Sequence, residues 1–200
     1  MTLSEAVNGR RSIKVFDADH EITDAEINKL MELVVKSPTS YNTQNWRFCI
    51  VRNKELRVKM REVSKNQAQV TDSSAMVIIC GDKMAWSKDP KRYWKNYDDT
   101  KQEYMEKAIT TAYTDNMGKQ RDEALRSGAM AAMTLMLAAK DLGYDTCPMT
   151  GFHFDSMAEL INMPDSYEIV MMVALGKRKE DAGPRGGQID LSEVVSFDSF

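Results

Sequence analysis

The chain has 200 residues and a net charge of −3, with 42% hydrophobic and 28% charged residues, a balance typical of one globular domain and not of a disordered chain. This slightly acidic charge gives no overall field that would attract nucleic acid or an anionic membrane, so any anion site must be local. The first residues lack the apolar segment of a secretory signal, and the longest mostly apolar run, residues 129–139, is too short to span a bilayer. We therefore expect a cytoplasmic protein with no membrane partner.

A basic cluster follows the first predicted element, a short helix over residues 3–9. Arg10, Arg11, Ser12 and Lys14 place three cations and a hydroxyl within five positions. Guanidinium groups stay charged and present planar donors that match phosphate oxygens, so the cluster suits a phosphate dianion. On its own, however, a pair of arginines at the end of a helix is more often simply exposed to solvent and stabilised by the helix dipole.

A polar loop follows the second predicted helix. Thr23 and Glu26 form a capping box that opens this helix, which should end at Ser37 because Pro38 disfavours helical geometry in the residue before it. Residues 37–46 then supply amides and hydroxyls, which suit the polar edge of a planar heterocycle. On its own, however, a loop of this composition usually has these residues because they form turns and not because they bind a ligand.

Residues 46–51 read as a strand, and Asn53 should cap a basic helix that runs to about residue 64. Residues 75–80 are apolar without alternation, which indicates a strand buried on both faces. A further buried strand is expected over residues 169–175. Cys49, Cys80 and Cys147 lie in or beside predicted buried strands, so we expect reduced core thiols.

Residues 82–121 interleave aromatic and charged side chains. Aromatics among cations can bind single-stranded nucleic acid, but acidic residues in this segment cancel the positive charge. We therefore expect no nucleic-acid partner and interpret the segment as a helical cover over a pocket. Residues 122–142 predict a helix that is apolar on nearly all faces, as in a core or a subunit interface, with Gly143 as its stop.

Near the end of the chain, Asp155 should cap a short helix. The segment after Gly176 is basic and glycine-rich and becomes strand-like at residues 189–197. Because this tail has little to pack on nearby, we interpret it as an arm along another element or a partner subunit.

Several catalytic motifs are missing from the chain. It has no dinucleotide-binding glycine motif, P-loop, zinc-protease motif, Cys-x-x-Cys or nucleophile elbow. The histidines are His20 and His153, and the spacing of His153 and Asp155 is a weak metal signal, so we expect no metal site. Any chemistry is then carried by a bound cofactor, for which the protein supplies binding, orientation and electrostatics.

The order and spacing of these motifs resemble those of the FMN-dependent nitroreductase family (the nitro/flavin reductase superfamily). The resemblance covers nearly the whole chain and comprises residues 10–17, 37–40, 42–46, 72–75, 142–144, 148–152, 173–176, 184–185 and 191–195. It implies a single domain over residues 1–200 with a nitroreductase-like α+β fold, in which helices flank a mostly antiparallel central sheet. From the residues alone, buried strands alternating with helices would equally suggest a parallel α/β sheet.

The resemblance also implies an intertwined homodimer with two FMN sites at its interface. The helix at 122–142 would form the dimer core, residues 82–121 the cover, and the tail at 185–200 would extend over the partner. Lys14 is implied to be catalytic, because a fixed cation at the flavin N1/O2 edge favours the reduced anion. The implied cofactor-binding residues are Arg10, Arg11, Ser12, Lys14, Ser37, Pro38, Thr39, Ser40, Asn42, Gln44, Asn66, Pro148, Met149, Thr150, Gly151 and Arg185. Of these, the resemblance implies that Ser40 and Asn42, together with Ser37 and Thr39, come from the other subunit.

By this resemblance the protein is an FMN-dependent NAD(P)H oxidoreductase of the nitroreductase or quinone reductase type. It would pass electrons by a ping-pong mechanism from NAD(P)H through FMN to nitroaromatics, quinones or similar small-molecule acceptors. Two alternatives stay open. One is a different flavin reaction, such as dehalogenation, enone reduction or flavin fragmentation. The other is a flavin-binding module without turnover.

Overall fold

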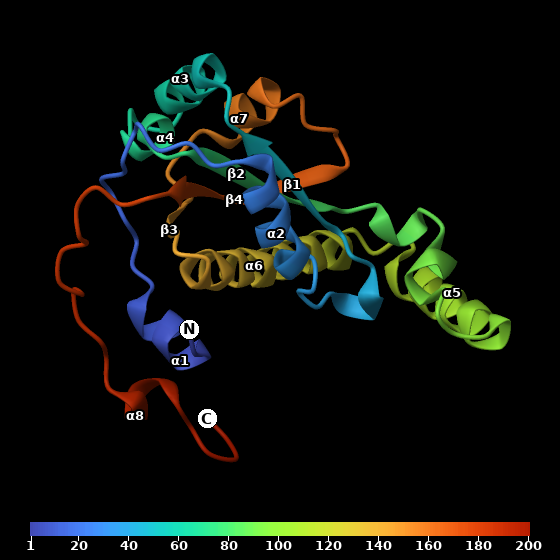
Figure 1. Cartoon of the computed structure of the whole chain (residues 1–200). Helices are drawn as coiled ribbons and strands as arrows, with labels where there is room; N and C mark the ends of the chain where they lie inside the picture. The colour runs from blue at the N-terminus through green and yellow to red at the C-terminus, as the bar shows by residue number, and fades with distance from the viewer.

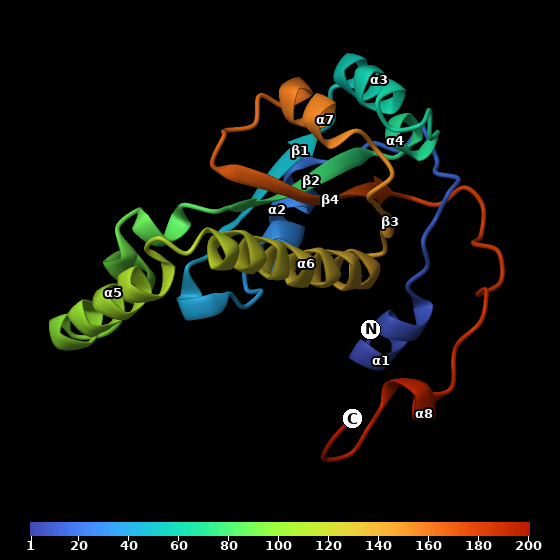
Figure 2. The same cartoon turned by 180° about the vertical axis from the view of Figure 1, so that it is seen from behind.

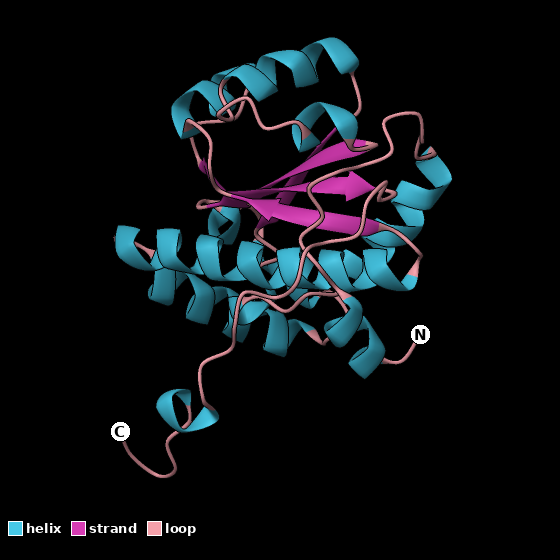
Figure 3. Cartoon of the chain, turned by 90° about the vertical axis from the view of Figure 1, so that its left-hand side faces the viewer, coloured by secondary structure: helices cyan, strands magenta, loops and turns pink.

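Four strands form one sheet at the centre of the computed structural model, which describes all of residues 1–200. The strands are β1 (Trp46–Val51), β2 (Ala75–Asp82), β3 (Asp145–Met149) and β4 (Tyr167–Gly176). Their order is β1-β2-β4-β3, and every neighbouring pair runs antiparallel. Helices cover both faces of the sheet (Figure 1, Figure 3). The predicted α+β class with an antiparallel sheet is therefore confirmed, and the parallel alternative is wrong.

Strand β2 is buried along its whole length, as its unbroken apolar sequence predicts. Successive side chains of a strand point to opposite faces, so β2 divides its residues between two cores. Val77 and Ile79 join the core that contains residues of α2 (Asp24–Val34) and α6 (Met117–Asp141). Met76 and Ile78 join the core that contains residues of α3 (Lys54–Glu62), α4 (Gln69–Asp72) and α7 (Phe154–Leu160). The sheet is thus the middle layer of three.

The long helix α6 (Met117–Asp141) and the shorter α2 (Asp24–Val34) lie together against one face of the sheet. The capping box of Thr23 and Glu26 is present as predicted, although α2 ends at Val34, before the expected stop. Asn116 caps α6, which begins five residues before the predicted start at residue 122. At its other end Gly143 adopts a left-handed conformation with φ of +79°, the glycine stop that the sequence predicts.

The opposite face carries α3 (Lys54–Glu62), α4 (Gln69–Asp72) and α7 (Phe154–Leu160). Asn53 caps α3 through its side-chain oxygen, which accepts a hydrogen bond from the N–H of Leu56 at 2.7 Å. The predicted cap of α7 is wrong: His153 occupies the N-cap position and Asp155 lies in the first helical turn. A carboxylate in that turn is also favoured by the helix dipole, so the sequence signal was displaced by two residues.

Between β2 and α6 the chain forms the short 3-10 helices η2 (Ala85–Ser87) and η3 (Pro90–Trp94) and then α5 (Asp99–Tyr113). These elements project away from the sheet at one end of α6 (Figure 2). Just before them, the last residue of β2, Asp82, is a buried carboxylate paired with Arg47 at 3.2 Å and with Lys88 at 2.7 Å. The segment therefore starts from a fixed ionic anchor, and its role as a cover stays a prediction.

Both chain ends lie at the other end of α6, where α1 (Leu3–Gly9) and the tail are found (Figure 1). The tail is exposed from Gly183 onward and includes a single short helix, α8 (Leu191–Val194). The strand-like prediction for residues 189–197 is therefore wrong. A strand needs a neighbouring strand to satisfy its backbone, and the chain supplies none here, so a local helical turn forms instead.

All three cysteines are free thiols, and Cys80 and Cys147 are buried. Burial raises the pKa of the Cys80 thiol to about 12, so this side chain stays neutral at physiological pH. None of the helices combines the length and apolar character that a membrane-spanning segment requires.

Candidate functional site

The predicted basic cluster lies on an extended segment along the edge strand β3. Ser12 pairs with Thr146 in a parallel bridge, and the N–H of Ile13 donates to the carbonyl of Thr146 at 3.0 Å. The side chain of Ile13 is fully buried, whereas Ser12 and Lys14 are exposed. Alternation along the extended chain thus turns the two polar side chains outward from the sheet edge.

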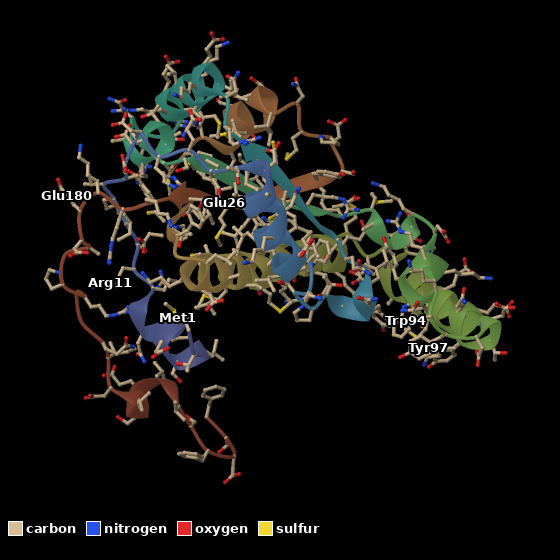
Figure 4. All side chains as sticks on the ribbon, viewed as in Figure 1. Met1, Arg11, Glu26, Trp94, Tyr97 and Glu180 are labelled. Atoms are coloured by element: carbon tan, nitrogen blue, oxygen red, sulfur yellow. The ribbon has the colours of Figure 1, made fainter.

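Arginines from both ends of the chain meet around one hollow of about 360 Å³. Arg10, Arg11 and Arg185 line it together with Ser12 and the start of the tail, and no carboxylate lines it. Arg185 Nη2 donates to the carbonyls of Asn8 at 3.0 Å and Arg10 at 3.2 Å. Arg11 Nη2 donates to the carbonyl of Gly183, which fixes its guanidinium between the N-terminal segment and the tail (Figure 4).

One donor in this hollow has no acceptor. Arg10 Nη1 is buried and makes no hydrogen bond. Three guanidinium groups without a counter-ion repel one another, and a buried unpaired donor costs free energy. The set therefore fits a phosphate, whose oxygens would accept these hydrogen bonds and neutralise the charge.

Lys14 stands beside the strand that leads to the second predicted group of cofactor residues. Its Nζ donates to Cys147 Sγ at 3.3 Å, and Cys147 lies in β3. Thr150 and Gly151 follow directly at the end of that strand. The N–H of Gly151 makes no hydrogen bond and is free to donate. Pro148 is half-buried, and the side chain of Met149 is buried in the core.

The loop between α3 and α4 reaches the same place. Arg61 Nε donates to Asn66 Oδ1 at 2.8 Å, which holds the predicted flavin contact Asn66 in a fixed orientation. The next residue, Gln67, donates from Nε2 to the carbonyl of Gly151 at 3.0 Å. Gln67 is a site residue that the sequence does not predict. No local pattern could reveal it, because its partner is 84 residues away along the chain.

The predicted cofactor-binding residues at 37–44 form a separate loop, between α2 and β1. Ser37 is buried, and its hydroxyl donates to the carbonyl of Val34 at 2.7 Å. Thr39 Oγ1 accepts from the N–H of Gln44 at 2.9 Å, which closes the loop around the short helix η1 (Ser40–Asn42). Asn42 donates from Nδ2 to the carbonyl of Tyr93 at 2.8 Å. Pro38 is exposed.

These two groups sit near opposite ends of α6. Lys119, close to the start of the helix, lies over the ring of Tyr41 at 5.5 Å. At the other end, Lys140 is next to Gly9, one residue before Arg10. Twenty-one positions separate Lys119 from Lys140, or about 32 Å at 1.5 Å per residue. One chain therefore does not bring the tip of the loop, residues 40–44, and the arginine hollow together (Figure 1). Ser37, at the start of the loop, lies beside the second half of α6, where its hydroxyl donates to Thr134 Oγ1 at 2.9 Å.

Left-handed backbone occurs in two of the predicted cofactor segments, the loop at residues 37–44 and the loop between α3 and α4. Tyr41, Asn42 and Gln44 have φ angles of 52°, 56° and 43°, and Lys65 and Asn66 have 54° and 53°. Such angles are uncommon outside glycine and gather at binding and catalytic sites. The structure thus adds a signal that the residue types alone do not carry.

An exposed apolar face spans α1, α2 and α6. Leu3, Leu33, Met130 and Met133 line a shallow hollow of about 570 Å³ there, and each keeps more than a third of its surface exposed. Contiguous exposed apolar surface on a folded chain marks an interaction site.

Comparisons with known proteins identify the family of this chain. The model of the family described as "Nitroreductase family" matches residues 7–177. Protein DrgA of Synechocystis is 48% identical over 182 residues, covering 91% of this chain and 87% of that protein. MhqN of Bacillus subtilis, named provisionally as an NAD(P)H nitroreductase, is 34% identical over 96% of each chain.

A solved structure extends the likeness to three dimensions. A protein from Exiguobacterium sibiricum, described provisionally as a nitroreductase and crystallised in complex with FMN, superposes with a TM-score of 0.92. It is 28% identical and covers 98% of this chain and 97% of its own. Sequence, fold and site geometry lead to one conclusion: this chain belongs to the nitroreductase family.

Proposed function

We propose that this protein is an FMN-dependent NAD(P)H oxidoreductase that passes electrons by a ping-pong mechanism to nitroaromatics, quinones or similar small acceptors. The observation that carries the proposal is the hollow of Arg10, Arg11 and Arg185, with its unpaired buried donor and no carboxylate. The FMN complex of the Exiguobacterium protein and the NAD(P)H nitroreductase name of MhqN support it. A cytoplasmic location stays a prediction from the sequence.

The chain's own residues have three tasks in this proposal. Arg10, Arg11 and Arg185 hold the FMN phosphate with charge-assisted hydrogen bonds, and Ser12 adds a hydroxyl. Asn66 and the free N–H of Gly151 donate to the flavin ring. When bound, FMN supplies the hydride acceptance and electron delivery that none of these side chains can perform.

Lys14 has an electrostatic task. We assign it to the N1/O2 edge of the flavin, where two-electron reduction leaves negative charge. Its ammonium is positioned by Cys147 at 3.3 Å, so the charge is in place before reduction and needs no reorganisation.

We further propose that the active form is a homodimer. The tip of the loop, residues 40–44, and the arginine hollow lie too far apart in one chain to contact one cofactor, but a second copy running antiparallel along α6 would bring them together. The exposed apolar face of Leu3, Leu33, Met130 and Met133 gives such a copy a surface to bury. The exposed tail at residues 185–200 would then pack over the partner.

An anaerobic visible spectrum of the FMN-reconstituted, desalted protein, recorded before and after addition of NADH or NADPH, tests the enzymatic proposal. We expect retained flavin absorbance that bleaches with at least one nucleotide and returns when a quinone or nitroaromatic is added. Retained absorbance that neither nucleotide bleaches would instead indicate a binding module. Turnover of an enone or haloaromatic far above that of any quinone would indicate the other flavin chemistries.

A further inference from the structure

A second set of cations surrounds a smaller cavity that shares no residue with the arginine hollow. The cavity has a volume of about 150 Å³ and lies among the segment after Phe16, the end of β1, the start of α3 and the residues before β2. Its polar lining consists of three cations, one carboxylate, two hydroxyls and an imidazole, from Arg52, Lys54, Arg57, Glu21, Ser73, Ser74 and His20. Neither the sequence motifs nor the proposed electron transfer gives this cavity a role.

Arg57 is the unusual member of this lining. It is only 5% exposed, and the sole hydrogen bond of its guanidinium runs from Nη1 to the carbonyl of Ser73. Its Nε is buried without a partner, and no carboxylate lies within ion-pairing distance. Burial lowers the pKa of the Arg57 guanidinium, and the Asp72 carboxylate acts on that guanidinium only from beyond ion-pairing distance. A buried cation with no counter-ion costs several kcal/mol, so the protein gains if an anion joins it.

The start of α3 adds to the positive potential of this cavity. Lys54 is the first residue of this nine-residue helix, and its backbone N–H has no partner. Unpaired N–H groups at a helix start carry partial positive charge and bind anions readily. The helix start and the buried guanidinium of Arg57 thus act on the same cavity.

The neighbouring carboxylates are committed to other cations. Asp24 is paired with Arg52, and Glu21 lies 3.7 Å from the Lys54 ammonium at a highly exposed position. Ser74 donates its hydroxyl proton to the carbonyl of His20 at 2.8 Å and lies 3.0 Å from His20 Nδ1. None of these groups neutralises Arg57.

The size of the cavity limits the ligand. Sites for drug-sized ligands occupy about 300 Å³ or more, so this cavity excludes a nucleotide and admits a small ion. We propose that it binds a small tetrahedral oxyanion of the phosphate or sulfate class, held by Arg57 and the start of α3. This inference does not depend on the proposed oxidoreductase function.

Isothermal titration of inorganic phosphate into the FMN-reconstituted protein, at constant ionic strength set with chloride, tests the site. We expect one phosphate per chain, with sulfate competing. Arg57→Lys keeps the charge but loses the planar donors, so binding should weaken at least tenfold. Lys54→Pro removes the unpaired N–H at the first helical position, where proline suits the helix, and should weaken binding severalfold. Lys59→Gln removes one charge from an exposed position on the same helix and should leave binding unchanged.

Three results would overturn the proposal. The first is the absence of saturable phosphate binding to the wild-type protein. The second is binding that Lys54→Pro leaves unchanged, because this variant removes the backbone N–H at the start of α3; it decides the question even where Arg57→Lys fails to fold. The third is binding that Arg185→Ala abolishes and Arg57→Lys preserves, which would place the anion in the arginine hollow. Flavin content measured on the same samples reports separately on the proposed FMN site.

Discussion

Arg10 differs from its two arginine neighbours in how its guanidinium is satisfied. Arg11 and Arg185 both donate to backbone carbonyls, whereas the buried Nη1 of Arg10 has no acceptor in the chain. Of the three arginines, Arg10 would therefore gain the most hydrogen-bonding free energy from a bound phosphate. Hydrogen bonds to charged groups contribute about 1.5–3 kcal/mol, which corresponds to a factor of roughly 10 to 150 in affinity.

We therefore predict that Arg10→Ala weakens FMN binding by at least tenfold. Fluorescence titration of flavin-free protein with FMN measures the change directly. Lys107→Ala removes a positive charge from an exposed position on α5 and should leave the affinity unchanged. Equal FMN affinity in wild type and Arg10→Ala would contradict the assignment of the hollow.

Lys14 should affect the potential of the cofactor more than its retention. Lys14→Met keeps the length of the side chain but removes the charge that stabilises the reduced flavin. We predict that FMN stays bound while its two-electron midpoint potential falls by about 30 mV or more, since 30 mV corresponds to about 1.4 kcal/mol. A reductive titration against a reference dye measures the shift.

Lys14→Arg serves as the matched variant for this measurement. It retains the positive charge and should recover most of the potential. If Lys14→Met and wild type have the same midpoint potential, Lys14 does not act electrostatically on the flavin.

The site residues that lie on one continuous segment could be predicted from the sequence, because the basic cluster brings its cations together within five positions. Their partners could not. Cys147 lies 133 residues from Lys14 and Gln67 lies 84 from Gly151, so only the folded chain brings each pair together. A hydrogen bond of this kind leaves no periodicity or spacing for a sequence argument to use.

At the scale of elements, close approach of α6 to the sheet depends on two glycines. A Cβ added at Gly81 of β2 would lie 2.6 Å from Ala124 Cβ and 2.7 Å from the Ala124 carbonyl oxygen. A Cβ added at Gly128 of α6 would lie 2.4 Å from a methyl group of Val170 in β4. The backbone of β2 therefore packs against the backbone of α6 at Gly81, and the Val170 side chain packs against the backbone of α6 at Gly128, with no room for a further side chain at either position.

We predict that Gly81→Ala destabilises the protein by about 1–3 kcal/mol, the usual cost of overpacking a core. Urea unfolding followed by circular dichroism measures the difference. Gly118→Ala lies in the first turn of α6, where a Cβ meets nothing closer than 3.9 Å, and should be neutral or stabilising. A Gly81→Ala variant as stable as wild type would show that α6 can shift without cost.

Elements with strong local signals could be predicted well. The strand at residues 46–51 has the predicted bounds, and the capping residues of α2 and α3 are correct. Errors arose where the deciding interaction is not local. The start of α6 was set too late because its first residues are polar, and the tail was assigned a strand although no neighbouring strand is available to it.

For the whole molecule, the proposed dimer depends on the apolar face of α6. Met133→Glu places a charge in that face, and burying an unpaired carboxylate is costly. We predict that the variant elutes as a monomer in size-exclusion chromatography with light scattering and retains little FMN. Its far-ultraviolet circular dichroism should match that of wild type.

Val58→Glu is the control, because Val58 is an exposed apolar residue on α3, on the other side of the sheet. It should leave both mass and flavin content unchanged. A Met133→Glu variant that remains dimeric, or a monomeric variant that keeps its FMN, would contradict the proposed arrangement.

Strand order is the feature of the whole molecule that the residues alone left open. Strands buried on both faces are typical of parallel sheets, yet β2 and β4 are buried and antiparallel because helices cover both faces of this sheet as well. Burial thus reports the layers on each side of a strand and not its direction. The family resemblance was needed to choose between the two topologies.

Because the loop at 37–44 and the arginine hollow of one site would come from different subunits of the proposed dimer, two defective variants should complement each other. In a hybrid of Arg10→Ala and Asn42→Ala chains, one site would carry both defects and the other would carry none. Each variant alone should bind FMN poorly, while co-expression of the two should restore flavin and turnover in the hybrid. A mixture that stays inactive would mean that each chain builds its site by itself.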